Sequence, residues 1–175
     1  MRGLFIGRFQ PFHRGHLHSL QYIAREVDEI VIVIAAAQYS YTLENPFTAG
    51  ERVEMVRLGA IGLHDRLFII PVDNIPSNHA WPRHVLSYVP RVDVVYSNNE
   101  LVQLLFKEYG LPVKSTPILP GVNGSLVRRL MAENDNWRNL VPQTVADFIE
   151  KINGVERVKL LWRIQARLPG ERLGT

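Results

Sequence analysis

Two histidines three residues apart are the first feature of the chain that suggests chemistry. His13 and His16 enclose Gly15 in the sequence "HRGH". At the beginning of a helix the backbone N–H groups have no partner within the helix and carry partial positive charge, which suits a phosphate group. Side chains three positions apart on a helix can point the same way. The spacing therefore predicts a pair of donors for phosphate oxygens.

Two other interpretations of the histidine pair compete with phosphate binding. The pattern H-x-x-H by itself is more typical of ordinary surface histidines. A zinc site needs three or four protein ligands, and the first carboxylate after the pair is Glu26. Phosphate binding fits best of the three, because Gly7 and Gly15 allow the backbone to come close to a ligand.

The elements on either side of the pair are those of a strand–loop–helix unit. "RGLFI", residues 2–6, is a short apolar run typical of a buried strand. Helical spacing of apolar residues follows over 16–27, at Leu17, Leu20, Ile23, Ala24 and Val27. The histidines are thus expected in the turn where α/β proteins bind ligands.

The rest of the chain alternates in the same way, with no internal repeat or linker. Strands are expected over 2–6, 29–37, 66–72, 92–97 and 111–119, the last interrupted by proline and so placed at an edge. The helices between them include one opened by Thr48 and Glu51 as a capping box and one ended by Gly110. We expect one α/β domain over 1–175, a doubly wound, Rossmann-like parallel sheet with a helical C-terminal part from about 125 to 175. Its ligand should lie at the carboxyl ends of the strands, near the switch point.

The basic charge is concentrated at the C-terminal end. Residues 154–175 hold five basic and two acidic side chains, which accounts for the formal net charge of +3. A nucleic-acid-binding protein usually shows a stronger and broader basic bias, so we expect no nucleic acid as partner. The segment instead predicts an amphipathic helix with solvated arginines and an inward face formed by Val155, Val158, Leu161, Ile164 and Leu168.

Composition excludes several classes of protein. The chain of 175 residues has no cysteine, which excludes disulfides, thiolate metal sites and a cysteine nucleophile. The first residues lack a signal-peptide pattern, and no apolar run approaches the length of a membrane span. We therefore expect a cytoplasmic protein without a membrane partner.

Several sequence segments together resemble a known family. "HRGH" resembles the H-x-G-H signature of the nucleotidyltransferase superfamily, and "MRGLFIGRFQPFHRGHL" is similar to the archaeal-type nicotinamide-nucleotide adenylyltransferases. Further segments follow in that family's order and cover nearly the whole chain: "NPFTAGER", "NHAW", "YSNNELV", "GSLVRRLM" and "EKINGVERVK". The fourth of these looks like the family's second signature, S/T-x-x-R at a helix start, with Ser125 and Arg128.

The resemblance implies transfer of the adenylyl group of ATP to nicotinamide mononucleotide (NMN), giving NAD and pyrophosphate. It implies catalytic roles for His13, His16 and Arg128, and Mg²⁺ carried on the ATP phosphates rather than in a protein metal site. Substrate binding is expected at Gly7, Arg8, Phe9, Gln10, Gly15, Gln38, Asn78, Trp81, Asn98, Asn99, Gly124, Ser125 and Arg129. Family members also tend to be homo-oligomers, often hexamers.

Some of these residues have structural alternatives. Arg128 and Arg129 could be solvated helix residues, and Asn98 and Asn99 could be turn and N-cap residues. Trp81 is expected on the rim of the nicotinamide pocket, because Pro82 favours extended geometry at the residue before it. Its alternative is a core position under a long loop.

The chain departs from relatives in one loop, with Tyr41 where many have histidine and Glu44 where some have a basic residue. An adenylyl- or cytidylyltransferase for phosphopantetheine, a flavin or an alcohol phosphate is the alternative enzyme. A nucleotide-binding module without catalysis is the alternative outside enzymes.

Overall fold

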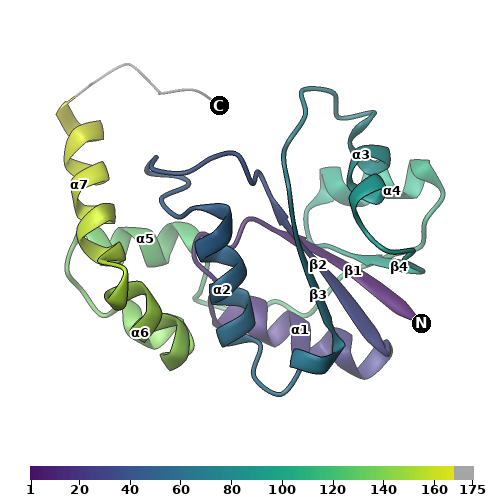
Figure 1. Cartoon of the computed structure of the whole chain (residues 1–175), viewed down its shortest axis with the longest axis horizontal. Coiled ribbons are helices and arrows are strands. Elements are labelled where there is room, and N and C mark those ends of the chain that lie inside the picture. The colour runs from purple at the N-terminus through teal and green to yellow at the C-terminus, as the bar shows by residue number, and fades with distance from the viewer. Residues whose placement is uncertain (168–175) are drawn as a thin grey trace.

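The computed structural model describes residues 1–167 (Figure 1). Its five strands form one sheet in the order β3-β2-β1-β4-β5, and every neighbouring pair is parallel. The strands are β1 (Arg2–Gly7), β2 (Glu29–Ala35), β3 (Leu67–Val72), β4 (Val94–Tyr96) and β5 (Val113–Lys114). Because the order runs outward from β1 in both directions, the switch point lies between β1 and β4. The doubly wound parallel sheet that the alternation of elements predicts is confirmed.

Helices cover both faces of the sheet, and three further helices come after the last strand in the sequence (Figure 1). They are α1 (Arg14–Glu26), α2 (Ala49–Gly59), α3 (Trp81–Tyr88), α4 (Glu100–Tyr109), α5 (Gly124–Ala132), α6 (Gln143–Lys151) and α7 (Gly154–Arg167). Single 3₁₀ turns, η1 (His64–Arg66) and η2 (Trp137–Leu140), precede β3 and α6. None of the helices in this part of the chain is long and apolar enough to cross a membrane.

The two faces of β2 belong to two separate buried clusters. Ile30, Ile32 and Ile34 pack with α1 and α2, whereas Val31 and Val33 pack with α3 and α4. This follows from the two-residue period of a strand, which directs successive side chains to opposite faces. The continuous apolar run of β2 is therefore the mark of a strand buried on both sides.

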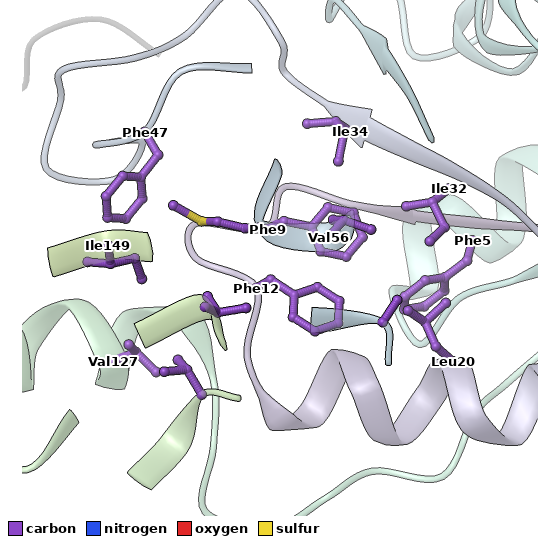
Figure 2. Close-up of a cluster of buried hydrophobic side chains, with 14 of the residues drawn as sticks. Phe5, Phe9, Phe12, Leu20, Ile32, Ile34, Phe47, Val56, Val127 and Ile149 are labelled. Carbon is purple, nitrogen blue, oxygen red and sulfur yellow. The ribbon is translucent and has the colours of Figure 1, made fainter. Parts of the chain in front are cut away.

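The C-terminal helices continue the first of these clusters. Phe12 and Phe47 from the loops belong to the same buried cluster as Val127 of α5 and Ile149 of α6 (Figure 2). One contiguous apolar cluster thus joins the sheet to the helices that follow it, and the burial of this surface stabilises both.

Two helix ends lie where local sequence signals predict them. Thr48 Oγ1 accepts the N–H of Glu51, and the Glu51 carboxylate accepts the N–H of Thr48, so the expected capping box opens α2. Gly110 ends α4 with φ of 101°, a conformation that glycine adopts without steric cost.

Other expectations differ from the structure. The strand expected over 111–119 pairs only at Val113–Lys114, although it does lie at the sheet edge. On α7, Ile164 is exposed rather than inward-facing, because the helix extends beyond the helices that cover Val158. Arg157 is not solvated either, since it forms a two-pronged ion pair with Glu51. Leu168 lies outside the described residues.

The packing of α2 against the loop before α1 generates the first prediction. A Cβ at Gly59 would lie 2.5 Å from two ring carbons of Phe12 and 2.9 Å from Val145, whereas a Cβ at Gly50, in the same helix, would meet nothing within 4 Å. Gly59→Ala should lower the free energy of unfolding by about 1–3 kcal/mol through overpacking. Gly50→Ala should leave it unchanged or raise it, by up to about 1 kcal/mol. Urea unfolding of both variants tests this, and equal effects would contradict it.

Candidate active site

Two cavities lie at the carboxyl ends of β1 and β4 and share one wall. Ile6, Ser97 and Asn99 line both of them. The first, which we call the tryptophan cavity, has a volume of about 350 Å³ and is closed by Trp81 and the loop after β3. The second, the histidine cavity, has a volume of about 240 Å³ and is lined by His13 and His16 together with residues 116–119 after β5. Both lie where an open α/β sheet binds ligands, at the switch point.

The two histidines cap α1 reciprocally. The N–H of His16 donates to Nδ1 of His13 over 3.3 Å, and the N–H of His13 donates to Nδ1 of His16 over 3.1 Å. Their rings are stacked, with centroids 3.6 Å apart. An Nδ1 that accepts a hydrogen bond carries no proton, so the proton of each neutral ring is on Nε2. Each imidazole thus keeps one N–H free to donate to a ligand.

The surroundings also keep both rings neutral. Burial, with a smaller contribution from the positive charge of Arg128, lowers the pKa of His13 to about 4. Burial and the neighbouring His13 lower the pKa of His16 well below its ordinary value. At neutral pH the pair therefore presents Nε2–H dipoles rather than two cations, which would repel each other at this separation.

The glycines of this turn make room for the site's own side chains. A Cβ at Gly15 would lie 3.0 Å from the His13 ring, and a Cβ at Gly7 would lie 2.9 Å from the ring of Phe9. We expected these glycines to allow the backbone near a ligand. Their immediate function is to admit the neighbouring rings, although Gly7 also lines the tryptophan cavity and Gly15 the histidine cavity.

Phe9 belongs to the core rather than to the cavities. It is buried, stacks on Phe12 at a centroid distance of 6.0 Å, and lies 4.6 Å from the ring of His16. It lines neither cavity, so it supports the histidine turn from the core side. Arg8, the residue before it, is exposed and lines the tryptophan cavity.

Arg128 reaches the same turn from α5. Its Nη1 donates to the carbonyl of Gln10 over 2.9 Å, and its Nη2 donates to Ser125 Oγ over 3.3 Å. Burial and the charge of Arg8 lower its pKa to about 10, so it stays a cation at neutral pH. Within residues 1–167 no carboxylate lies within ion-pair distance of it. This buried, unpaired cation beside the histidines is suited to bind an anion.

The remaining residues of "GSLVRR" differ in their positions. Gly124 is the first residue of α5, and a Cβ there would meet Nη1 of Arg128 at 3.0 Å, which explains the glycine. Ser125 orients Arg128 through its hydroxyl. Arg129 is exposed and lines neither cavity, which agrees with the alternative of a solvated helix residue.

Two glutamines expected to bind substrate instead hold loops together. The side-chain amide of Gln10 donates to the carbonyl of Phe47 and accepts its N–H, and the amide of Gln38 does the same with Asn74. Neither glutamine lines either cavity. Because both ends of each amide are engaged, the side chains position the loops around the site. The loop containing Asn74 closes the tryptophan cavity.

Trp81 lies both at the tryptophan cavity and against the core. It lines that cavity together with Asn78, and its ring meets Phe106 edge-on at a centroid distance of 5.8 Å. The extended geometry expected from Pro82 is wrong, because Trp81 is the first residue of α3 and proline is accepted in the first helical turn.

The two asparagines after β4 carry structural hydrogen bonds at the shared end of the site. Asn99 is the N-cap of α4, and its Oδ1 accepts the N–H of Val102. Both groups of the Asn98 amide bond to Thr116, whose hydroxyl also bonds to Ser19 over 2.9 Å. Ser19 and Thr116 line the histidine cavity and were not expected from the sequence, because neither belongs to a recognisable motif.

Tyr41 and Glu44, the two residues that depart from the pattern of relatives, line neither cavity. The guanidinium of Arg157 lies 4.4 Å from the centre of the Tyr41 ring, a cation–π contact that ties this loop to α7. Glu44 is exposed.

The chain is similar in sequence to a known enzyme family. Residues 4–130 match the family described as cytidylyltransferase-like. The chain is 46% identical over 164 residues to the nicotinamide-nucleotide adenylyltransferase of Thermococcus onnurineus, covering 91% of this chain and 88% of that protein. It is 48% identical over 160 residues to the enzyme of the same name from Methanothrix thermoacetophila, covering 90% and 94% respectively.

A solved structure has the same fold at low sequence identity. The bifunctional NMN adenylyltransferase/ADP ribose pyrophosphatase of Francisella tularensis, crystallised with AMP and a manganese ion, superimposes with a TM-score of 0.65 at 19% identity. The match covers 96% of this chain but only 56% of that one. With this fold, the near-complete alignment to the archaeal enzymes and the intact "HRGH" turn, the chain belongs to the nicotinamide-nucleotide adenylyltransferases of the cytidylyltransferase-like family.

Proposed function

We propose that the protein transfers the adenylyl group of ATP to nicotinamide mononucleotide, producing NAD and pyrophosphate. The observation that carries the proposal is the pair of cavities sharing one wall, with two neutral imidazole donors and a buried arginine at the turn beside it. A two-substrate transfer needs two adjoining pockets and phosphate donors where they meet. The names of the archaeal relatives support the same pair of substrates.

The chemistry requires no general base. A phosphate oxygen of the mononucleotide attacks the α-phosphorus of ATP in line, the bond between that phosphorus and the bridging oxygen breaks, and pyrophosphate leaves with the electron pair. The attacking phosphate has a second pKa of about 6, so it is largely dianionic at neutral pH. Catalysis then depends on positioning two anions and on stabilising charge in the transition state.

The residues at the turn bind different phosphate groups of ATP. The Nε2–H groups of His13 and His16 donate to the α-phosphate, where charge develops. Arg128, oriented by Ser125, and the beginning of α5 bind the β- and γ-phosphates, because a guanidinium can hold two oxygens at once.

The tryptophan cavity receives the mononucleotide. Trp81 presents an aromatic face to the positively charged pyridinium ring, which its quadrupole attracts. Asn78 or the backbone beside it binds the carboxamide, and Arg8 binds the phosphate. Adenosine then occupies the histidine cavity beside Asn98 and Asn99.

Mg²⁺ is the proposed companion ion, held by ATP phosphates and water. No aspartate or glutamate is among the described residues that line the two cavities, whose polar groups are instead donors suited to phosphate. Such an ion neutralises phosphate charge, and Mg²⁺ usually keeps several waters. The neighbouring structure with AMP and manganese supports the use of a divalent cation.

The protein is further proposed to act in the cytoplasm, as one domain and as a homo-oligomer, with a hexamer as the expected form. The apolar cluster shared by the sheet and the helices α5 and α6 supports a single domain. Exposed Leu160, Trp162 and Ile164 on α7 offer apolar surface for assembly. Light scattering measures the oligomeric state.

Pyrophosphate release tests the reaction directly. The protein is incubated with ATP, Mg²⁺ and one phosphate acceptor at a time: nicotinamide mononucleotide, its deamidated form, phosphopantetheine, a flavin phosphate and an alcohol phosphate. Release should be fastest with a pyridine mononucleotide. Release with another acceptor alone would identify a different transferase, and nucleotide binding without release would identify a non-catalytic module.

His16→Ala should reduce turnover by about a hundredfold or more while changing substrate affinity little. The lost Nε2–H donor acts where charge develops in the transition state, and one such donor contributes on the order of 3 kcal/mol. Steady-state kinetics and calorimetry measure the two effects. His16→Gln serves as a control, because glutamine at this position can still cap the helix. If His16→Ala kept near-normal turnover, His16 would not be a catalytic donor.

Trp81→Leu should weaken binding of nicotinamide mononucleotide by about 0.5–2 kcal/mol and leave ATP binding unchanged. Leucine can still pack against Phe106, but it lacks the aromatic face that attracts a pyridinium ring. Calorimetry with each substrate measures the affinities, and the melting temperature controls for packing. A lower melting temperature with unaltered mononucleotide affinity would assign Trp81 to the core alone.

A further inference from the structure

Arg52 on α2 is fully buried and donates only to backbone carbonyls. Its Nη1 donates to the carbonyls of Arg8 and Ala35 over 2.9 and 2.8 Å. Its Nη2 donates to Ala36 over 3.0 Å, with longer bonds to residues 37 and 39, and its Nε donates to Thr48. One guanidinium therefore joins three segments: the turn after β1, the loop after β2 and the beginning of α2.

The acceptors of Nη1 continue the pairing of the two central strands. The parallel ladder between β1 and β2 ends at the pair of Gly7 and Ile34. Arg8 and Ala35 are the next residues of each strand, and Arg52 Nη1 bonds to both of their carbonyls. The arginine thus holds the two strands together one step beyond the last pair of their ladder. Both of these residues line the tryptophan cavity.

The same bonds secure two unusual turns. Phe9 and Ala36 have φ of 53° and 52°, in the left-handed region that costs a residue with a Cβ about 1–2 kcal/mol. Arg52 binds the carbonyl before Phe9 and the carbonyls of both Ala35 and Ala36. Such turns persist only where surrounding contacts determine them, and here the guanidinium supplies those contacts.

Arg52 also brings charge to the site. No carboxylate within residues 1–167 forms an ion pair with it, and burial together with the charge of Arg8 lowers its pKa to about 10, so it remains protonated at neutral pH. A buried cation without a carboxylate partner is costly to the fold. Since two of its acceptors, Arg8 and Ala35, line the tryptophan cavity, this cost indicates a role beyond packing.

We propose that Arg52 is a positioning residue for the transfer reaction, which sets the backbone of Arg8 and Ala35 and so directs the Arg8 guanidinium to the phosphate of the mononucleotide. The inference rests on the proposed function, because that function places the mononucleotide in the tryptophan cavity. It assigns to Arg52 no contact with either substrate.

Arg66 provides a matched control for Arg52. Its guanidinium also donates to backbone carbonyls, those of Ala24, Val27 and Asp28, and it also joins separate segments of the fold. It lies before β3, at the amino ends of the strands and therefore at the opposite end of the sheet from the site. Lysine at either position keeps the charge but loses the planar fork that binds several carbonyls at once.

Arg52→Lys should lower kcat/KM for nicotinamide mononucleotide between about tenfold and a hundredfold, the effect of a small misplacement at a reacting centre. The affinity for the mononucleotide, measured by calorimetry without ATP, should fall as well, while the affinity for ATP stays within about twofold. Arg66→Lys should lower the melting temperature. It should leave unchanged kcat/KM for the mononucleotide and the affinities for the mononucleotide and for ATP. If folded Arg52→Lys behaved like Arg66→Lys, the proposal would be overturned.

A double variant shows whether Arg52 acts through Arg8. In an Arg8→Ala background, Arg52→Lys should have little further effect on mononucleotide affinity, because the side chain that it positions is gone. Independent effects that add would contradict the proposal.

Hydrogen exchange on the unaltered protein tests the same link if the variants do not fold. Adding the mononucleotide should slow exchange in segment 48–52, which lines neither cavity but is joined to the tryptophan cavity by Arg52. Segment 36–39 does not serve this test, because Gln38 also joins it to Asn74 at that cavity. Protection confined to the cavity lining would overturn the proposal. Calorimetry and hydrogen exchange do not require turnover. A chain that binds the mononucleotide but releases no pyrophosphate would therefore refute the proposed function. The role of Arg52 in mononucleotide binding would still be decided by calorimetry and exchange.

Discussion

The first turn of α1 is closed by two histidines, each of which accepts the other's backbone N–H at Nδ1. This reciprocal contact caps the helix, fixes the ring proton on Nε2 and stacks the rings at 3.6 Å. Burial then keeps both rings neutral. Gly15 and the aromatic rings beneath the turn are arranged around the pair. The same hydrogen bonds therefore build the helix end and prepare two donors for a phosphate.

The site contains two buried arginines that form no ion pair within residues 1–167. Arg52 bonds to backbone carbonyls, and Arg128 bonds to the carbonyl of Gln10 and the hydroxyl of Ser125. Burial, with a smaller contribution from the charge of Arg8, lowers the pKa of both. Carbonyl dipoles stabilise a guanidinium in part, but they leave its net charge uncompensated. On the proposed function, an anionic substrate would supply opposite charge beside Arg128, so that substrate binding would stabilise the protein.

Side chains that bond to backbone hold the loops in place around the two cavities. Gln10 and Gln38 each pair with both backbone groups of one distant residue. Asn98 accepts the N–H of Thr116 and donates to its hydroxyl. Each glutamine amide thus makes the two hydrogen bonds that a neighbouring strand would make. Polar residues near a site are easily assigned to substrate, but here their hydrogen bonds are already used within the protein.

The sequence alone determined those features that depend on neighbours along the chain. The alternation of strands and helices, the two-faced burial of β2, the Thr48 capping box and the Gly110 helix end all follow from local periodicity and backbone preference, as does the position of the histidine turn. Motif order also identified the family. Only the tertiary structure decided which polar groups were already bonded, that Ile164 is exposed, and that Arg52 joins the ends of β1 and β2. These three features depend on contacts between residues far apart in the sequence. Periodicity shows which side chains share a face of a helix or strand, but it does not show which residues pack against that face.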